Sequence, residues 1–249
     1  LMFVYYLITR WKELGKINGK EYIVKTIVTT ETIKTIAERN GVEMYDVYTG
    51  FKWIANVMRE NEGKKNYIGG GEESYGFLCE DFVRDKDAVS ACVILAEIAA
   101  WAKDQGLSLY QLLQKIYVEY GFSKEKGISV VKKGKSGAEE IEAMMKKFRE
   151  NPLTEIAGSK VTYFYDYSTL KGKDYAENET VTLDMPTTSN VLQYFTEDNT
   201  KVSIRPSGTE PKIKFYCEVH SKVKSIDELP EAEKAAEEKI NQIKASLGI

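Results

Sequence analysis

The sequence predicts two unlike domains: an α/β domain with a mixed sheet flanked by helices over residues 1–121, and a smaller α+β domain with an antiparallel sheet over residues 122–249. Three observations lead to this prediction. A chain of 249 residues is long enough to bury two hydrophobic cores. The first half alternates helical and strand-like segments, whereas the second half groups its strands together. The change falls in a stretch rich in glycine and lysine at residues 121–137, where we place the domain boundary.

The first half begins with a helical pattern. Leu1, Val4, Tyr5 and Ile8 recur at helical spacing, and Gly15 ends the pattern. Neither a capping residue nor an initiator methionine precedes them, so we interpret the chain as a piece of a longer protein. Strands are then expected over residues 22–28, 43–48 and 66–68, and helices over residues 31–40 and 51–60.

Two further helices are expected to complete the first domain. Residues 87–105 are apolar on nearly all sides, so we expect this helix to be buried. Ser108 and Gln111 have the spacing of a capping box, which opens a helix over residues 109–119.

The second half is predicted to hold two helices and an antiparallel sheet. Capping boxes formed by Ser136 with Glu139 and by Ser225 with Glu228 are expected to open the helices. Each helix then carries apolar residues at steps of three or four. Residues 160–167 and 202–204 are strand-like, and apolar residues alternate with polar ones over residues 213–220.

Composition argues against several classes of function. A formal net charge of −3 implies no surface for a polyanion. The longest apolar stretch, residues 88–101, is interrupted by polar residues and is too short to span a bilayer, and the N-terminus carries no export signal. Cys79, Cys92 and Cys217 show no C-x-x-C spacing. We therefore expect a cytoplasmic protein that binds neither membranes nor nucleic acid.

The segment from Gly69 to Phe77, GGGEESYGF, has the composition of a sugar-binding loop. Consecutive glycines at a strand end let a backbone approach a ligand closely, and two carboxylates with a hydroxyl supply the acceptors and donor that vicinal hydroxyls need. A solvated glycine turn with surface acids fits the same composition.

The segment from Arg205 to Lys214, RPSGTEPKIK, lies as a tight turn between two predicted strands. An arginine fork can bind phosphate in a bidentate way, and hydroxyls and backbone N–H groups can complete an anion site. The order of residues is not that of a Walker P-loop, and no helix follows the turn. A hairpin with exposed polar residues is the alternative interpretation.

Together these two segments resemble the α-D-phosphohexomutase family, which includes phosphoglucomutases and phosphomannomutases. In that family a G-E-x-S loop of the third domain contacts sugar hydroxyls, and an R-x-S-G-T-E-P loop of the fourth holds the phosphate that does not react. Both loops occur here in that order. The likeness extends to residues 25–30, 49–54 and 84–87, so it covers most of the chain. It implies the third and fourth domains of a phosphohexomutase, the fourth with a fold like that of the TATA-box-binding protein.

The resemblance implies the role of each residue in the sugar site. Glu72 and Ser74 match the positions that hydrogen-bond two ring hydroxyls, and Glu73, the variable residue between them, is similar to glucose-oriented members. The loop on the opposite wall of the substrate cleft is matched by Thr49, Gly50 and Lys52.

The phosphate site is implied in the same way. Lys86, in an R-x-K-D segment, matches a family lysine near the phosphosugar, although Lys86 and Lys52 also fit as solvated lysines. The phosphate-binding loop is matched by Arg205, Ser207, Gly208 and Thr209.

The resemblance implies an isomerase. A phosphoserine of the first domain donates its phosphoryl group to a hexose phosphate, a hexose 1,6-bisphosphate forms, and the other phosphate returns to the serine. Hexose 1-phosphate and hexose 6-phosphate are thereby interconverted, with Mg²⁺ neutralising the phosphoryl oxygens in the full-length enzyme. The implied partners are hexose phosphates and the missing N-terminal domains.

The family's reactive loops have no counterpart in these 249 residues. Neither a T-A-S-H-N-P-like serine loop nor a D-x-D-x-D-R magnesium loop occurs. His220, the one histidine, lies on the polar side of a predicted strand and is expected to be a surface residue. We therefore expect no catalytic residue and no metal ligand in this chain, which is predicted to be inactive alone.

Two other functions stay open at this point. A non-catalytic module that binds sugar phosphates would use the same two loops. A nucleic-acid-binding second domain is disfavoured by the many glutamates of the last helix, against which residues 132–135 supply only a short basic run. Glucose and mannose differ at a hydroxyl that the sugar loop need not contact.

Overall fold

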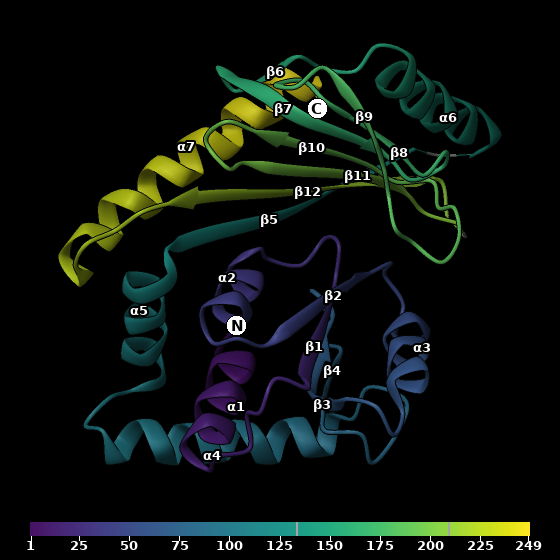
Figure 1. The fold of residues 1–249 in the computed structure, drawn as a ribbon. Helices are drawn as coiled ribbons and strands as arrows, with labels where there is room; N and C mark the ends of the chain where they lie inside the picture. The colour runs from purple at the N-terminus through teal and green to yellow at the C-terminus, as the bar shows by residue number, and fades with distance from the viewer. Residues whose placement is uncertain (133, 209) are drawn as a thin grey trace. The chain divides into compact units, whose positions relative to one another are not determined.

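The protein is described by a computed structural model that covers residues 1–132, 134–208 and 210–249, without the side chain of Lys135. It divides into two compact units, shown in Figure 1. Unit 1 comprises residues 1–121 with residues 223–227, and unit 2 comprises residues 122–222 with residues 228–249.

Unit 1 is built on a four-stranded mixed sheet in the order β2-β1-β3-β4. The first three strands are parallel, and β4 returns antiparallel to β3. All residues of β1 are buried, as expected for a central strand covered on both faces. The strands are β1 (Glu21–Thr26), β2 (Glu43–Val47), β3 (Asn66–Gly71) and β4 (Phe77–Cys79).

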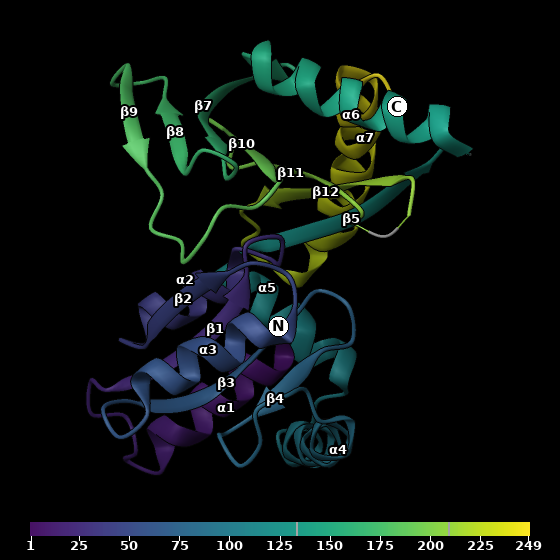
Figure 2. The same cartoon turned by 90° about the vertical axis from the view of Figure 1, so that its right-hand side faces the viewer.

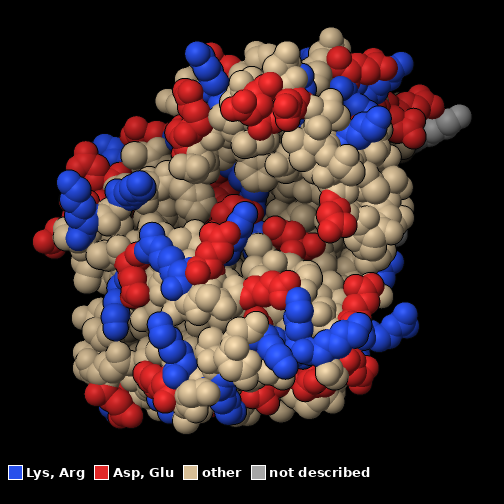
Figure 3. Space-filling view, in the orientation of Figure 1, with Lys and Arg blue, Asp and Glu red and all other residues tan. Residues whose placement is uncertain are grey.

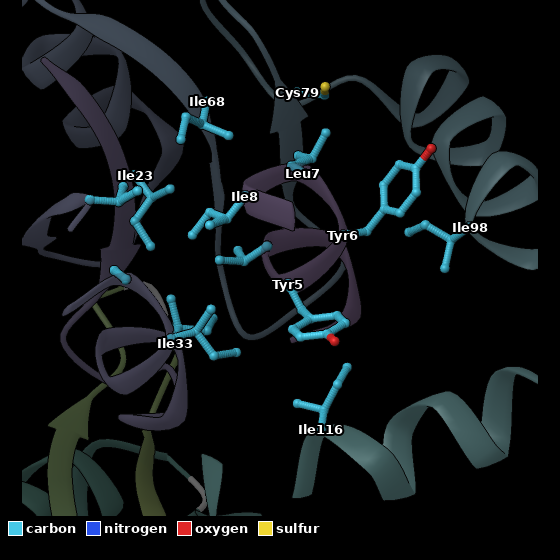
Figure 4. Close-up of a cluster of buried hydrophobic side chains, with 14 of the residues drawn as sticks. Tyr5, Tyr6, Leu7, Ile8, Ile23, Ile33, Ile68, Cys79, Ile98 and Ile116 are labelled. Carbon is cyan, nitrogen blue, oxygen red and sulfur yellow. The ribbon is translucent and has the colours of Figure 1, made fainter. Parts of the chain in front are cut away.

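Helices cover both faces of this sheet. One core cluster joins α1, α2, α4 and α5 to the sheet, and a second joins α3 to the opposite face. Figure 4 shows the first cluster, where Tyr5 and Tyr6 of α1 point toward Ile116 and Ile98 of the outer helices. The helices are α1 (Met2–Glu13), α2 (Thr32–Arg39), α3 (Phe51–Asn61), α4 (Ala88–Asp104) and α5 (Leu109–Tyr120).

Helix α4 contradicts the prediction that residues 87–105 form a buried helix. Ile98 and Ala102 are buried in the core, but Val89 and Val93 are 74% and 60% exposed. The prediction was wrong because apolar residues on all sides of a helix do not show which side packs on the core and which side is left exposed. The capping box of Ser108 and Gln111 at the start of α5 is confirmed.

Unit 2 is an α+β unit with an antiparallel sheet, as predicted. Its strands follow the order β5-β12-β11-β10-β7-β8-β9, and β6 pairs with β7. Figure 2 shows α6 and α7 over the same face of this sheet. Phe148 of α6 packs on Phe215 of β12 with ring centroids 6.3 Å apart. The helices are α6 (Gly134–Glu150) and α7 (Leu229–Leu247).

Several strands of unit 2 have no counterpart among the predicted elements. Residues 122–131, in the stretch predicted as the boundary, form β5 and pair with β12 along its whole length. The strands are β5 (Phe122–Val131), β6 (Glu155–Ile156), β7 (Ser159–Asp166), β8 (Lys171–Asp174), β9 (Glu179–Thr182), β10 (Leu192–Thr196), β11 (Lys201–Pro206) and β12 (Lys212–Ser221).

The two predicted capping boxes of unit 2 are not formed. Helix α6 already begins at Gly134, so Ser136 lies inside it. A short 3₁₀ turn, Ile226–Glu228, precedes α7, and Pro230 occupies the first turn of that helix, where its missing N–H is not needed. In the described part of the chain, no helix has the length and apolarity needed to cross a membrane.

Candidate functional site

In unit 1 the predicted sugar loop follows the carboxyl ends of parallel strands. Strand β1 ends at Thr26, β2 at Val47 and β3 at Gly71, and the three ends lie at one edge of the sheet. Loops at this edge are where open α/β sheets bind ligands. Residues 49–50 follow β2, and residues 72–76 connect β3 to β4.

The glycine run serves the sheet itself, which differs from the prediction of a ligand-facing turn. Gly69, Gly70 and Gly71 are part of β3. A Cβ at Gly70 would lie 2.2 Å from the Val24 carbonyl oxygen, and one at Gly71 would lie 2.4 Å from that of Gly76. These contacts are too close for a side chain, so the glycines allow the neighbouring backbones to approach.

Glu72 joins the two loops at this edge. Its Oε1 accepts a hydrogen bond of 2.5 Å from the backbone N–H of Gly50, and its own N–H donates to the Gly76 carbonyl at 2.7 Å. Gly50 has φ +116°, a conformation that residues with side chains rarely adopt, at the N-terminus of α3. The structure thus brings together Glu72 and Gly50, which the sequence placed 22 positions apart.

Glu73 is held by the end of β1. Its Oε2 accepts a hydrogen bond of 3.0 Å from the Thr26 hydroxyl, which in turn lies 2.9 Å from the Thr29 hydroxyl. Thr26 and Thr29 are buried. Since Thr26 donates its one hydroxyl proton to Glu73, Thr29 donates to Thr26. Sequence reasoning had not assigned Thr26 to the site, because nothing local to it indicates the contact with Glu73.

A buried lysine lies beside these threonines. The Nζ of Lys25 is 2.6 Å from Asp46 Oδ1 and 3.0 Å from Glu31 Oε1, and it also contacts the Thr29 carbonyl oxygen at 3.5 Å. Burial alone would lower the pKa of Lys25, but Asp46 and Glu31 outweigh it and raise the pKa above its usual range. The lysine is therefore charged, and it fixes the loop after β1.

The tip of the loop points into solvent. Ser74 is exposed, and Tyr75 is fully exposed with φ +56°. A positive φ is uncommon for a residue with a bulky side chain and represents local strain. The hydrogen bond from the Glu72 N–H to the Gly76 carbonyl closes the loop, and it holds the residues between them in this conformation.

The remaining predicted residues of unit 1 lie around the start of α3. Thr49 is half-buried, and Lys52 is exposed with its Nζ 5.0 Å from the ring centroid of Trp53. Lys86 is exposed, pairs with Asp85 at 3.2 Å, and lies 6.0 Å from the ring centroid of Phe51. The structure therefore brings Lys86 to the loop of Thr49 and Gly50.

In unit 2 the predicted phosphate loop connects β11 to β12. The Ser207 N–H donates to the Lys212 carbonyl at 2.7 Å, which closes the turn. Lys212 also pairs with Glu210 at 2.7 Å, and its hydrogen bond lowers the pKa of Glu210. Gly208 is exposed, and a Cβ there would have no neighbour within 4 Å, so open space lies above the turn. Thr209 lies outside the described residues.

Arg205 stands directly opposite a second cation. In the register of β11 and β12, its partner is Lys214, so both side chains lie on one face of the sheet. Among the described residues Arg205 makes no ion pair. Like charges in opposite positions destabilise a sheet unless an anion lies between them. Sequence reasoning had not assigned Lys214 to the site, although its place in the alternating strand pattern already puts it on that face.

His220 lies near the end of β12, away from the phosphate loop of the same unit, and it is less exposed than the surface position that was predicted. It is half-buried, and its Nε2 is 2.6 Å from Glu218 Oε1. Within residues 1–132, 134–208 and 210–249, no group of three or more histidine, cysteine, aspartate or glutamate side chains is placed to hold a metal ion.

Comparison with protein families gives two matches. Residues 2–120 match the model for the phosphoglucomutase/phosphomannomutase alpha/beta/alpha domain III, and residues 129–236 match the model for the C-terminal domain of the same family. The chain belongs to the phosphoglucomutase/phosphomannomutase family. The predicted resemblance to the third and fourth domains is therefore confirmed.

Curated relatives extend the family assignment. The chain is 35% identical over 208 residues to a phosphoglucomutase of Staphylococcus haemolyticus, a match that covers 84% of this chain and 38% of the relative. It is 40% identical over 194 residues to a phosphoglucomutase of Staphylococcus aureus, covering 78% and 35% of the two chains. The chain thus spans well under half the length of these relatives.

Solved structures of the family share the fold. The phosphoglucomutase parafusin of Paramecium, in its open form, superposes with a TM-score of 0.58 at 18% identity, covering 96% of this chain and 41% of that one. A phosphoglucomutase/phosphomannomutase family protein of Burkholderia thailandensis gives a TM-score of 0.55 at 16% identity, covering 99% and 42%.

Proposed function

We propose that this chain supplies the sugar-recognition and phosphate-anchoring parts of a phosphoglucomutase/phosphomannomutase that interconverts hexose 1-phosphate and hexose 6-phosphate. Its residues 1–121 act as the third domain of that enzyme and its residues 122–249 as the fourth. The observation that carries the proposal is the cation pair of Arg205 and Lys214 beside an open turn, in a chain whose family models name these two domains.

The phosphate loop has the chemistry of an anion site. Arg205 can donate two parallel hydrogen bonds to phosphate oxygens, and Lys214 adds a second positive charge on the same face. Ser207 and the backbone at Gly208 border the open space above the turn. Thr209, from its place in the motif, belongs to the same loop. A phosphate bound here relieves the repulsion between the two cations.

The sugar loop has the chemistry of a hydroxyl-binding site. Glu72 and Glu73 each use one carboxylate oxygen to hold the loop, through Gly50 and Thr26 respectively. Each carboxylate keeps a second oxygen as an acceptor for a ring hydroxyl. Ser74 at the exposed tip can donate or accept. Lys86, near the start of α3, supplies a cation for the phosphosugar.

The chemical step is assigned to domains that the longer relatives contain. A magnesium ion would neutralise phosphoryl oxygens during transfer. We place the metal ligands and the phosphoserine in those domains, because the family's serine loop and magnesium loop have no counterpart in these 249 residues. We therefore expect this chain to show no mutase activity in an assay that couples glucose 6-phosphate formation to a dehydrogenase.

A nucleic-acid-binding function has less support. Acidic and basic side chains are interspersed on the face shown in Figure 3, and no single-sign patch stands out there. A non-catalytic module that binds sugar phosphates would use the same loops. It would differ from the mutase in having no domains with the serine loop and the magnesium loop.

Calorimetric titration of the chain with glucose 1-phosphate and glucose 6-phosphate tests the binding roles. Arg205→Ala should weaken both affinities by about ten- to a hundredfold, because charged hydrogen bonds contribute roughly 1.5–3 kcal/mol. Glu72→Ala should weaken both by a similar factor. Arg205→Lys keeps the charge but not the fork, and should fall between wild type and Arg205→Ala.

A matched control is Glu238→Ala on the exposed side of α7, which should leave both affinities unchanged. Equal affinity of wild type and Arg205→Ala for both phosphates would rule out the phosphate loop as the anchor.

A further inference from the structure

Tyr75, at the tip of the sugar loop, is the most exposed of the large apolar side chains that the structure describes. Within the described part of the chain, its ring contacts no other ring and its hydroxyl makes no hydrogen bond. A tyrosine ordinarily buries its ring and keeps only its hydroxyl in water. A ring that lies wholly in solvent on a loop therefore indicates a contact with something other than the fold.

The backbone conformation of Tyr75 is also unfavourable for a tyrosine. Its φ of +56° lies in the left-handed region, which glycine, asparagine and aspartate adopt more readily than aromatic residues. Since the side chain contacts nothing, no packing compensates for this strain. Strained residues that bring no contact to the fold are typical of ligand-binding sites.

The loop on both sides of Tyr75 is held by hydrogen bonds. The Glu72 N–H donates to the Gly76 carbonyl at 2.7 Å, and Glu73 Oε2 accepts from the Thr26 hydroxyl at 3.0 Å. These contacts fix the backbone at the tip before any ligand binds. The ring of Tyr75 therefore projects from a preorganised position, which lowers the cost of using it in binding.

Glu72 places an acceptor oxygen close to Tyr75 in the loop. Its Oε1 accepts from the Gly50 N–H at 2.5 Å, whereas its Oε2 lies over Gly76, 2.9 Å from the position that a Cβ of Gly76 would take. Gly76 directly follows Tyr75, so a carboxylate oxygen and an aromatic ring occupy neighbouring positions. A hexose needs this combination, because its hydroxyls form hydrogen bonds at the rim and its C–H groups form apolar faces.

We propose that Tyr75 is a substrate-recognition residue whose ring stacks on a C–H face of the hexose that Glu72 and Ser74 hold by its hydroxyls. The inference rests on the proposed function in taking a hexose phosphate as the ligand of the sugar loop. Glucopyranose carries C–H groups on both faces of its ring, and apolar contact is non-directional. One aromatic ring can therefore contact hexose 1-phosphate and hexose 6-phosphate, whose phosphates lie at opposite ends of the sugar.

NMR of the chain with carbon-13-labelled tyrosine rings observes Tyr75 directly, and the spectrum of Tyr75→Phe assigns its resonances. The labelled chain is titrated with glucose 1-phosphate and, separately, with methyl glucoside, which carries no phosphate. The ring resonances of Tyr75 should shift with both ligands. Those of Tyr110, which is 66% exposed on α5, should shift with neither. Tyr75 resonances that respond to neither ligand would overturn the proposal.

Two variants separate the ring of Tyr75 from its hydroxyl. Tyr75→Phe keeps the ring and should bind glucose 1-phosphate and glucose 6-phosphate as tightly as the wild type. Tyr75→Asn removes the ring and should weaken both affinities by a similar factor, about two- to tenfold. Tyr110→Asn is the matched control and should leave both affinities unchanged. An equal loss in Tyr75→Phe and Tyr75→Asn would assign the contact to the hydroxyl and overturn the stacking.

Stability distinguishes recognition from a structural role. Asparagine adopts positive φ more readily than tyrosine, and the change removes no contact, so Tyr75→Asn should raise the urea midpoint measured by tryptophan fluorescence. A residue that only held the loop would lower the midpoint. A lower midpoint, with faster hydrogen exchange over residues 72–76, would assign Tyr75 to the fold and overturn the proposal.

The outcomes for Tyr75 and for the proposed function are distinguishable. If Arg205→Ala binds both phosphates as the wild type does, while Tyr75 still shifts with methyl glucoside, the phosphate anchor is wrong and the role of Tyr75 stands. If the wild type and Tyr75→Asn bind both sugar phosphates equally well, the sugar phosphates remain the ligands and the role of Tyr75 fails.

Discussion

Lys25 in unit 1 and Lys201 in unit 2 are both almost fully buried, yet their charges are balanced in different ways. Lys25 pairs with two carboxylates that keep contact with water, since Asp46 is 35% and Glu31 27% exposed. Lys201 pairs at 2.9 Å with Glu218, which is itself buried and also contacts His220 at 2.6 Å.

The difference shows what each pair depends on. Lys25 has two partners, each partly solvated, so the loss of one leaves the other in place. Lys201 and Glu218 are both removed from water, so neither tolerates the loss of its partner. The pair of unit 1 also borders the sugar loop through Thr26. The pair of unit 2 lies at the end of β11 and β12 opposite the phosphate loop. One buried lysine therefore supports a site, and the other supports the fold.

The largest expected effect is that of Glu218→Ala. It removes the buried carboxylate that pairs with the Lys201 ammonium, and should lower the free energy of unfolding of unit 2 by about 3–5 kcal/mol. Urea unfolding followed by hydrogen exchange of unit 2 peptides measures it. Tryptophan fluorescence monitors unit 1 separately, because Trp11, Trp53 and Trp101 all lie there.

The control for Glu218→Ala is the double variant Lys201→Met with Glu218→Leu. Replacing both charges of a buried pair by apolar side chains is often neutral or stabilising. A loss below about 1 kcal/mol in Glu218→Ala, or an equal loss in the double variant, would contradict the role given to the pair.

The two pairs should also respond to pH in opposite directions. Burial alone would raise the pKa of Glu218, but Lys201 and His220 outweigh it and lower the pKa below its usual range. A carboxyl with a lowered pKa in the folded state stabilises above its unfolded pKa, about 4.3, and this contribution is lost as the pH falls toward the folded pKa. Unit 2 should therefore lose stability below about pH 4.3.

Lys25 has the opposite sign because its pKa is raised in the folded state. Its contribution to stability is complete below the unfolded pKa of about 10.4 and is lost as the pH rises toward the folded pKa. Urea unfolding from pH 3 to 11 measures both effects, with hydrogen exchange reporting on unit 2 at acid pH and tryptophan fluorescence reporting on unit 1 at alkaline pH. Glu218→Gln should flatten the acid limb for unit 2 and leave the alkaline limb of unit 1 unchanged. An acid limb that persists in Glu218→Gln would assign it to other carboxylates.

The contrast between the units also marks what the sequence could predict. Both loops were predicted because their residues are contiguous, so their chemistry is visible in a few letters. The fold class was predicted from local periodicity, and both sheets have the expected character. The pairs of Lys25 with Asp46 and of Thr26 with Glu73 join positions far apart in the chain, and no local pattern indicates them.

Two elements were mispredicted for identifiable reasons. Strand β5 has charged residues at Lys124, Glu125 and Lys126, which hid its strand character. Lys124 contacts Glu233 and Glu237 of α7 at 2.8 Å, so its charge is balanced by a helix more than 100 positions later. The exposure of α4 was missed because apolar residues on nearly all sides of a helix do not show which side packs on the core.

The smallest expected effect on stability, and the one that separates site from fold, is that of Thr26→Val. The change removes the hydroxyl that holds Glu73 while leaving Lys25 and its carboxylates in place. It should lower the free energy of unfolding of unit 1 by only about 1 kcal/mol, the net contribution of one hydrogen bond. Hydrogen exchange over residues 71–77 should nevertheless become faster, and the affinity for glucose 1-phosphate should fall severalfold.

Thr200→Val in unit 2 is the matched control for Thr26→Val. Thr200 is equally buried, but its hydroxyl has no hydrogen-bond partner among the described residues, so the change should be neutral for stability, exchange and affinity. If Thr26→Val lowers stability without changing exchange at residues 71–77 or the affinity, then Thr26 belongs to the fold like Lys201, and the link from the buried pair to the sugar loop is absent. If exchange and affinity change while stability barely does, the hydroxyl of Thr26 positions Glu73, because the two valine variants alter the side chain in the same way and differ in the hydrogen bond that is lost.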